Sequence, residues 1–212
     1  MFFPYGRGIT HSAARDRLER LIEERAKPGA DRAEIDKRIW DLLGQRRAVM
    51  FTDLSGFSRD VAEFGIIHFL HTIYDSIKLF VPPIELHGGI LLKAEADSLL
   101  VTFRGPDQAL ACAVAMQHAA EAHNREVPPE EQVLLCVGLG FGDMLAVGDE
   151  DVFGAEVNAA SKFGEDTAKA GEILVTEDFR VHLQDLSGYE FSEIDFVPPG
   201  AAAAFKVDYR RR

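Results

Sequence analysis

The order of the elements predicted after residue 46 constrains the fold most. The run AVMFTDL predicts a buried strand, because it is short, apolar and rich in residues that favour strands. The run SRDVAEFGIIHFLHTIYDSIKLFV predicts a helix that ends at Pro82 and Pro83. The run GGILLKAEADSLLVTF predicts two strands that turn near Glu95 and Ala96, and therefore a hairpin.

The rest of the chain continues this alternation of strands and helices. The run GPDQALACAVAMQHAAEAHNRE predicts an alanine-rich helix, QVLLCVGLGFG and MLAVGD predict two strands, and GAEVNAASKFGEDTAKA predicts a helix that ends at Gly171. The glycines of GFGD at 140–143 are expected to serve turns. The runs EILVT, YEFSEI and AAFKVDY predict the last strands. The core order β-α-β-β-α-β is the ferredoxin-like order, so we predict an α+β fold with helices packed on such a sheet.

Residues 1–46 differ from the region that follows. The runs SAARDRLERLIEERA and DRAEIDKRIWDLLG predict two amphipathic helices, separated by the turn KPGAD. Asp31 and Glu34 have the spacing of a capping box. We therefore predict a helical hairpin over 1–46, which packs on the main domain or on a second copy of the chain as a dimerisation or regulatory element, and a second domain over 47–212.

The overall charge and the cysteines exclude several classes of protein. A net charge of -12 argues against a nucleic-acid-binding protein held by bulk electrostatics. Cys112 and Cys136 have neither the number nor the spacing of a disulfide framework or a zinc site. No apolar run approaches the roughly 20 residues that span a bilayer, and the N-terminus lacks the pattern of a signal peptide. We expect a cytoplasmic protein without a membrane span.

Two aspartates lie where predicted strands meet a turn. Asp53 ends the first strand and Asp97 begins the third, and these strands are neighbours in a ferredoxin-like sheet, so the two carboxylates are expected to meet. Two carboxylates together with water and substrate phosphates are a common way to hold Mg²⁺. The backbone N–H groups of Ser55, Gly56 and Phe57 would then form an anion site at a helix N-terminus. The alternative is that Asp53 is only a turn or cap residue.

Three segments carry a resemblance to a known family. The runs FTDLSGFS, HGGILLKAEADSLLVTF and LGFGDMLAVGDEDVFGAEVNAASK resemble, in order and spacing, the catalytic domain of class III nucleotidyl cyclases. The resemblance covers about residues 47 to 208. It implies a homodimer with active sites at the interface, where one protomer supplies the metal ligands and the other supplies the residues that recognise the base and stabilise the transition state.

The resemblance also assigns roles to residues on the predicted strands. It implies that Asp53 and Asp97 hold two Mg²⁺ or Mn²⁺ ions, with a backbone carbonyl from Leu54 as a further ligand. It implies that Lys93 and Asp151 recognise the adenine of ATP. Lys93 can donate to adenine N1 and Asp151 can accept from the adenine amino group, whereas guanine presents the reverse pattern, so this pair favours ATP.

Two further residues are assigned to the ribose and the phosphates. The resemblance implies that Asn158 orients the ribose, and it places Lys162 where the family has an arginine that stabilises developing charge. A spacing of four puts both residues on one helix face, although a solvated surface pair would have the same spacing. Lysine keeps the charge but loses the planar fork of arginine. Ala96 replaces a glycine of the family, and alanine there costs free energy if its φ is positive.

The resemblance therefore implies an adenylate cyclase. Such an enzyme converts ATP to 3′,5′-cyclic AMP and pyrophosphate by two-metal-ion catalysis, in intracellular signal transduction. Two alternatives stay open. The departures at Ala96 and Lys162 are also compatible with a weak or degenerate cyclase fold that binds nucleotide or only dimerises, and the substrate could be GTP or a pyrimidine nucleotide.

Overall fold

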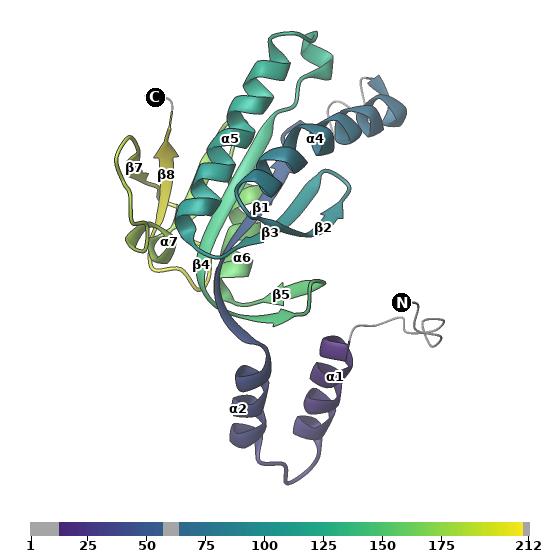
Figure 1. Ribbon diagram of the computed structural model, residues 1–212, viewed down its shortest axis with the longest axis vertical. Helices are drawn as coiled ribbons and strands as arrows, with labels where there is room; N and C mark the ends of the chain where they lie inside the picture. Colours follow the sequence, from purple (N-terminus) through teal and green to yellow (C-terminus); the bar gives the residue numbers. More distant parts are fainter. Residues whose placement is uncertain (1–12, 57–63, 210–212) are drawn as a thin grey trace.

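The computed structural model describes residues 13–56 and 64–209. A pair of N-terminal helices, α1 (Ala13–Ala26) and α2 (Arg32–Leu43), extends from one end of a sheet that carries the other helices (Figure 1). None of the helices in these two ranges is both long enough and apolar enough to cross a membrane.

The sheet has the strand order β2-β3-β1-β4-β6-β8-β7, with β5 paired to β4. β1 lies between β3 and β4 and is antiparallel to both, so the predicted contact between the first and third strands is confirmed. The strands are β1 (Gly44–Leu54), β2 (Ile90–Glu95), β3 (Ser98–Phe103), β4 (Leu135–Val147), β5 (Asp151–Phe153), β6 (Ile173–Thr176), β7 (Glu190–Glu193) and β8 (Ala204–Asp208).

Helices cover both faces of this sheet, as expected for the predicted α+β fold. They are α4 (Ile66–Leu86), α5 (Pro106–Asn124), α6 (Ala155–Ser161), which continues into a π-helical turn over Lys162–Thr167, and α7 (Glu177–Val181), with a short 3₁₀ turn over Pro129–Glu131. α5 lies in front of the sheet and α6 behind it in Figure 1. Residues that alternate along β1 face opposite ways: Met50 joins the core under α4 and α5, and Val49 joins the core under α6.

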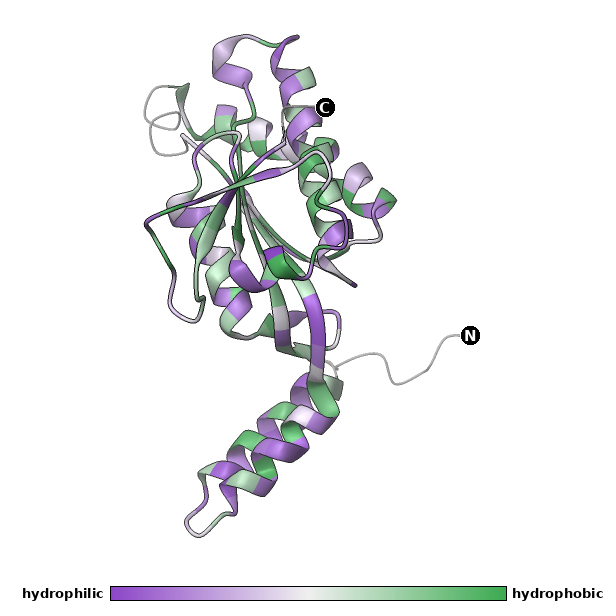
Figure 2. Ribbon diagram, turned by 90° about the vertical axis from the view of Figure 1, so that its left-hand side faces the viewer, coloured by the Kyte–Doolittle hydropathy of each residue, from purple (hydrophilic) through white to green (hydrophobic). Residues whose placement is uncertain are grey.

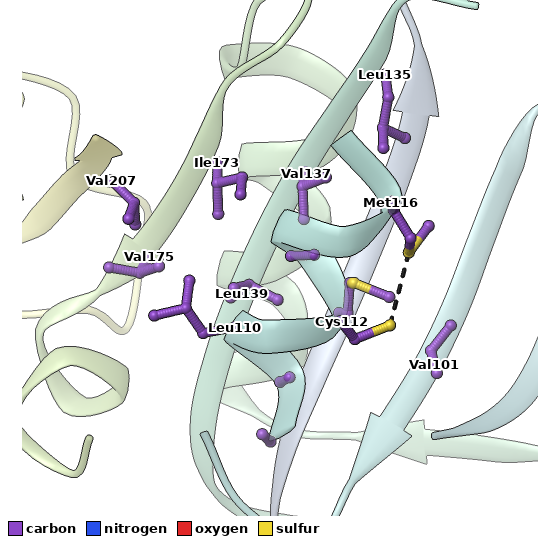
Figure 3. Packing of buried hydrophobic residues seen from close by; sticks show 14 of the residues in the cluster. Val101, Leu110, Cys112, Met116, Leu135, Val137, Leu139, Ile173, Val175 and Val207 are labelled. Atoms are coloured by element: carbon purple, nitrogen blue, oxygen red, sulfur yellow. Dashed lines mark hydrogen bonds between the residues drawn. The ribbon is translucent and has the colours of Figure 1, made fainter. Parts of the chain in front are cut away.

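The core beneath α5 is apolar and closely packed. Figure 3 shows Leu110, Cys112 and Met116 of α5 against side chains of β4 and β6. The Cys112 thiol contacts the Met116 sulfur at 3.7 Å, and both residues are fully buried. The cysteines Cys112 and Cys136 are free and buried.

The N-terminal hairpin is held by apolar and ionic contacts. Leu21, Ile35 and Ile39 form a small buried cluster between α1 and α2, and Leu145 of β4 packs against it. The predicted cap is confirmed, because the Asp31 carboxylate accepts a hydrogen bond of 3.1 Å from the backbone N–H of Glu34. Figure 2 shows polar and apolar residues alternating along both helices. β1 starts at Gly44, directly after α2, so the expected boundary after residue 46 lies inside a strand.

Three of the sequence predictions about elements are wrong. α4 does not end at Pro82 and Pro83 but runs to Leu86, because Ile84 is buried in the core and the helical hydrogen bond from His87 N–H to the Pro83 carbonyl persists at 3.1 Å. The two strands expected around GFGD are one continuous β4, so these glycines serve no turn. The predicted start of the helix near residue 58 lies outside the described residues.

The third error concerns the helix that was expected to reach Gly171. It changes to a π-helical turn after Ser161, where the Ala168 N–H donates to the Phe163 carbonyl at 2.7 Å. β5 and α7 were not predicted, whereas the hairpin of β2 and β3 and the strands β6, β7 and β8 were.

Glycines in β4 let α6 approach the sheet closely. A Cβ atom at Gly138 would lie 2.1 Å from the Ala160 carbonyl oxygen, and one at Gly140 would lie 2.5 Å from the Glu156 carbonyl oxygen. Any larger residue at these positions would push α6 away from the sheet. Gly138 and Gly140, the second of which was expected to serve a turn, therefore position the helix that carries Asn158.

Candidate active site

The structure brings the two predicted metal ligands together. Asp53 is the tenth residue of the 11-residue strand β1, and Asp97 lies in the two-residue turn between β2 and β3. Because Thr52 pairs with Leu99, this turn lies beside the end of β1. The Ser98 hydroxyl, one residue after Asp97, donates to Asp53 Oδ1 at 3.3 Å.

Burial is the main influence on the pKa values of this pair. Burial, followed by the negative charge of Asp97, raises the pKa of Asp53 to about 6. Hydrogen bonds from the Leu54 backbone and from Ser98 act in the opposite direction. Burial also raises the pKa of Asp97. Two half-buried carboxyl groups whose pKa values are both raised by burial form a site that a divalent cation would stabilise.

The oxygen donors here fit Mg²⁺ or Mn²⁺. Both ions accept carboxylate and carbonyl oxygens and commonly keep several waters or substrate oxygens as ligands. Within residues 13–56 and 64–209, no group of three or more His, Cys, Asp or Glu side chains is placed to hold a metal ion. A site built from Asp53, Asp97 and the Leu54 carbonyl would therefore depend on water or substrate to complete its coordination.

The turn that carries Asp97 is strained. Ala96 has a φ of +51°, and it is the one non-glycine residue with a positive φ in the part of the chain that the structure describes. L-residues other than glycine pay roughly 1–2 kcal/mol in this region. The positive φ that would make alanine unfavourable at this position is therefore present, and Ala96 lowers the stability of the turn relative to glycine.

The expected anion site after β1 is only partly available. The Ser55 N–H donates to the Leu134 carbonyl at 2.8 Å, so the expectation that this amide is free for a phosphate is wrong. Gly56 has a φ of +104°, which suits a close approach of the backbone to a ligand. Phe57 lies outside the described residues. The Ser55 amide is occupied by this hydrogen bond to Leu134. A partner so distant in the sequence cannot be predicted from the sequence alone.

The two residues assigned to the base are in contact. Lys93 Nζ lies 2.8 Å from Asp151 Oδ2, while Asp151 Oδ1 accepts a hydrogen bond of 2.9 Å from the Val152 N–H. The Asp151 side chain is 14% exposed and that of Lys93 is 35% exposed, so the pair is largely shielded from water. Residues 58 positions apart thus form one polar unit.

Two irregularities of the sheet produce this contact, and neither was predicted. A β-bulge between Leu91 and Lys93 shifts the register of β2 and re-aims the residues beyond it. The short strand β5 folds back on β4, with Val147 opposite Asp151. Gly148, with a φ of +58°, is the sequence signal that would have indicated this second hairpin.

A small hollow lies beside Lys93 and Ser98. It encloses about 130 Å³ and is lined by Phe51, Lys93, Glu95, Ser98, Leu100 and Glu165. Lys93 lies in this hollow together with Ser98, which touches Asp53. The apolar walls come from Phe51 and Leu100, so a flat ring could pack there while its edge meets Lys93.

Asn158 and Lys162 lie together at a different hollow. They line a space of about 310 Å³ with Ser161 and Pro199. The Lys162 N–H donates to the Asn158 carbonyl, one helical turn earlier, so the prediction that both residues share a face is confirmed. Lys162 Nζ forms an ion pair with Asp166, and each side chain is 55% exposed. This pairing was not predicted.

A buried glutamate fixes the helix of Asn158, and sequence reasoning missed it. Glu156 is 5% exposed, and its carboxyl oxygen accepts hydrogen bonds from the Phe141 N–H at 2.9 Å and from the Thr176 hydroxyl at 2.6 Å. Burial raises the pKa of Glu156. Because these donors belong to β4 and to the end of β6, Glu156 ties α6 to two strands and so positions Asn158.

Comparison with known proteins identifies the family. The family model described as "Adenylate and Guanylate cyclase catalytic domain" matches residues 45–198. A protein of Rhizobium meliloti (strain 1021) named "Putative adenylate cyclase 3" is 33% identical over 119 residues, which is 56% of this chain and 19% of that protein. The match therefore spans about a fifth of the length of that relative.

Solved structures show the same fold. The adenylyl cyclase CyaB from P. aeruginosa aligns with a TM-score of 0.67 at 19% identity, over 80% of this chain and 97% of that one. An adenylate/guanylate cyclase/hydrolase from Silicibacter pomeroyi aligns with a TM-score of 0.64 at 24% identity, over 77% of this chain and 95% of that one. The likeness covers nearly the whole of both solved domains.

The strain at Ala96 gives a first testable expectation. We expect Ala96→Gly to raise the free energy of unfolding by about 0.5–1 kcal/mol, because relief of the left-handed strain exceeds the added entropy of the unfolded chain. The measurement is the urea midpoint at constant m-value. Ala94→Gly, in the interior of β2, is the matched control and should destabilise. An equal loss in both variants would contradict strain at Ala96.

The carboxyl pair gives a pH-dependent expectation. Because the folded-state pKa of Asp53 is about 6, above its ordinary value of 3.8, its contribution to stability is present at pH 4 and is lost as the pH rises through 6. In metal-free buffer at pH 7.5, Asp53→Asn should therefore raise the melting temperature by about 2–4 °C. The difference should vanish near pH 4.

Manganese provides the second half of that experiment. Mn²⁺ should raise the melting temperature of the wild-type protein, because it binds the folded state, but should have little effect on Asp53→Asn. Asp41→Asn, an exposed position on α2, is the control and should respond to Mn²⁺ like wild type. Equal stabilisation of Asp53→Asn by Mn²⁺ would argue against a metal site at the carboxyl pair.

Proposed function

We propose, because the chain belongs to the adenylate and guanylate cyclase catalytic domain family, that it is an adenylate cyclase that converts ATP to 3′,5′-cyclic AMP and pyrophosphate. The observation that carries the choice of ATP is the pair formed by Lys93 and Asp151 at 2.8 Å. The coarser activity, cyclisation of a nucleoside triphosphate, follows from the family. A role in intracellular signal transduction is the expected use of such a product.

The geometry of the Lys93–Asp151 pair suits adenine. The ammonium of Lys93 has three N–H donors, and only one is engaged by Asp151, so another can reach the ring nitrogen N1. The Asp151 carboxylate accepts only, which suits the amino group of adenine. Guanine offers an N–H at N1 and a carbonyl beside it, so both contacts would be mismatched and left unpaired in a shielded site.

The carboxyl pair supplies the proposed metal site. Asp53 and Asp97, with the Leu54 carbonyl, would hold Mg²⁺ or Mn²⁺, which when bound would lower the pKa of the ribose 3′-hydroxyl and neutralise the triphosphate. Placement at the end of β1 and in a two-residue turn keeps the two carboxyl groups fixed relative to the sheet. The strain at Ala96 is part of the cost of that placement.

The residues of the second hollow would act on the ribose and the phosphates. In the reaction the 3′-oxygen bonds to the α-phosphorus, the bond from this phosphorus to the bridging oxygen breaks, and pyrophosphate leaves while the 3′ proton passes to water. Asn158 would orient the ribose by hydrogen bonds, and Lys162 would balance the charge that develops on the phosphates. Lys162 must exchange Asp166 for the phosphates, and an exposed ion pair of this kind is worth only about 0–1 kcal/mol.

A homodimer would combine these groups into complete sites. Asn158 and Lys162 line a hollow that includes neither Asp53 nor Asp97, which supports a division of the metal ligands and the transition-state residues between two protomers. α4 also exposes a row of apolar side chains at helical spacing: Ile66, Ile67, Leu70 and Tyr74, which are between 51% and 76% exposed. A second copy of the chain would cover such a surface.

A weak cyclase that mainly binds nucleotide is the second candidate. It is favoured by two observations, the strained Ala96 beside a metal ligand and the engagement of Lys162 by Asp166. A nucleotide panel separates it from the first candidate and from a cyclase for GTP or a pyrimidine nucleotide.

The panel is a direct test of the activity. Purified protein with Mn²⁺ and ATP, GTP, CTP or UTP should form a cyclic nucleotide mainly from ATP, because only adenine matches the polarity of Lys93 and Asp151. Asp53→Ala should lower the rate by about a hundredfold or more. Product from GTP alone would overturn the choice of ATP, and no product from any nucleotide would overturn the enzyme.

Lys162 provides a separate expectation. Lys162→Arg should raise kcat about three- to tenfold with little change in KM, because the planar fork can contact two phosphate oxygens as charge develops. Lys169→Arg, an exposed position beyond the π-helical turn, is the matched control and should leave both constants unchanged. An unchanged kcat in Lys162→Arg would show that lysine already performs this role fully.

A further inference from the structure

The N-terminal hairpin reaches the residue assigned to base recognition. Arg15 of α1 places its Nε 3.0 Å from Glu150 Oε2 and its Nη2 3.9 Å from Asp151 Oδ2. This is the oxygen of Asp151 that Lys93 contacts at 2.8 Å. One carboxylate oxygen therefore lies between a cation from β2 and a cation from the hairpin.

The hairpin is seated on the strands that carry Asp151. Leu145 of β4 packs against the apolar cluster of α1 and α2, and two residues further along β4 Val147 pairs with Asp151. Figure 1 shows α1 lying next to the hairpin of β4 and β5. The apolar contact at Leu145 and the ionic contacts of Arg15 thus both involve the hairpin of β4 and β5. Movement of α1 would therefore affect Asp151 through both kinds of contact.

The two carboxylate oxygens of Asp151 have different partners. Its Oδ1 accepts from the adjacent Val152 N–H, which fixes one oxygen by a local turn. Its Oδ2 is oriented by Lys93 and Arg15, whose side chains are 35% and 31% exposed. If Lys93 turned toward a base, Arg15 would remain as an ionic partner of Oδ2 at 3.9 Å, held in place by its own hydrogen bond of 3.0 Å to Glu150.

We propose that Arg15 is a positioning residue for base recognition, which orients the Asp151 carboxylate as an acceptor from outside the sheet. This inference rests on the proposed role of Asp151 as the residue that reads the amino group of the base. It assigns to the hairpin a part in substrate selectivity. The ligand class is a purine nucleotide with an exocyclic amino group at the edge that meets Asp151.

Equilibrium binding tests this without requiring turnover. The probes are α,β-methylene-ATP and α,β-methylene-GTP, titrated in the presence of Mn²⁺ into the full chain. Arg15→Gln should weaken binding of the ATP analogue about two- to fivefold, the range of one exposed charged contact, and should weaken the GTP analogue less. Arg15→Lys should recover at least half of the lost selectivity, because the charge remains.

Arg38→Gln is the matched control. Arg38 forms an ion pair with Glu24 at 2.9 Å within the hairpin, so this variant weakens the hairpin without removing the ion pair of Arg15 with Asp151. It should retain the selectivity of wild type. Circular dichroism first verifies that Arg15→Gln is folded. The inference is overturned if this variant keeps the wild-type selectivity or binds both analogues more weakly by the same factor. It is also overturned if Arg38→Gln or Arg15→Lys loses as much selectivity as Arg15→Gln.

The outcomes separate the two proposals. A wild-type protein that makes cyclic AMP while Arg15→Gln keeps its selectivity overturns the role of Arg15 alone. A wild-type protein that selects the ATP analogue through Arg15 but makes no cyclic nucleotide supports the role of Arg15 and overturns the cyclase. Binding of neither analogue overturns both.

Discussion

The pairing of β1 with β4 is the constraint on which the other features depend. All eleven residues of β1 pair with β4, from Gly44 opposite Leu145 to Leu54 opposite Leu135. This single strand begins at the end of α2 and places Asp53 one residue before its own end. A slip of one residue would turn every side chain of β1 to the other face. The register therefore fixes the hairpin at one end of the sheet and a carboxylate at the other.

A second constraint is the close contact of α6 with β4. Gly138 and Gly140 remove the side chains that would otherwise separate the helix from the strand, and Glu156 fills part of that space with a carboxyl group. Burying a carboxyl group is costly unless it is hydrogen bonded, and here it accepts from Phe141 and Thr176. These hydrogen bonds fix the rotation of α6 about its axis, whereas apolar packing alone would tolerate several rotations. The position of Asn158 on α6 is set by the same hydrogen bonds.

Local pattern was sufficient for most of the strands and for the carboxyl pair, but it missed β5, divided β4 in two and did not predict the contacts between elements. Apolar runs and turn residues predict β1, β2, β3 and β6, and the ferredoxin-like order then predicts that Asp53 meets Asp97. The helix end at Pro82 failed because burial of Ile84 outweighs the loss of backbone donors. The bulge beside Lys93 and the partner of the Ser55 amide depend on neighbouring strands, so a single sequence does not encode them in a readable way.

The cations of the candidate site are each balanced by a carboxylate of the same chain. Lys93 pairs with Asp151, Arg15 with Glu150, and Lys162 with Asp166. In a chain of net charge -12, such pairing leaves little free positive charge to attract a polyanion indiscriminately. The pairs differ in exposure. Lys162 and Asp166 are exposed to water, so their separation costs little free energy. The Asp151 side chain is shielded and contacts Lys93, Arg15 and the Val152 N–H. Under the proposed function, a triphosphate would therefore replace Asp166 as the partner of Lys162, while the Asp151 carboxylate would stay in place to receive the base.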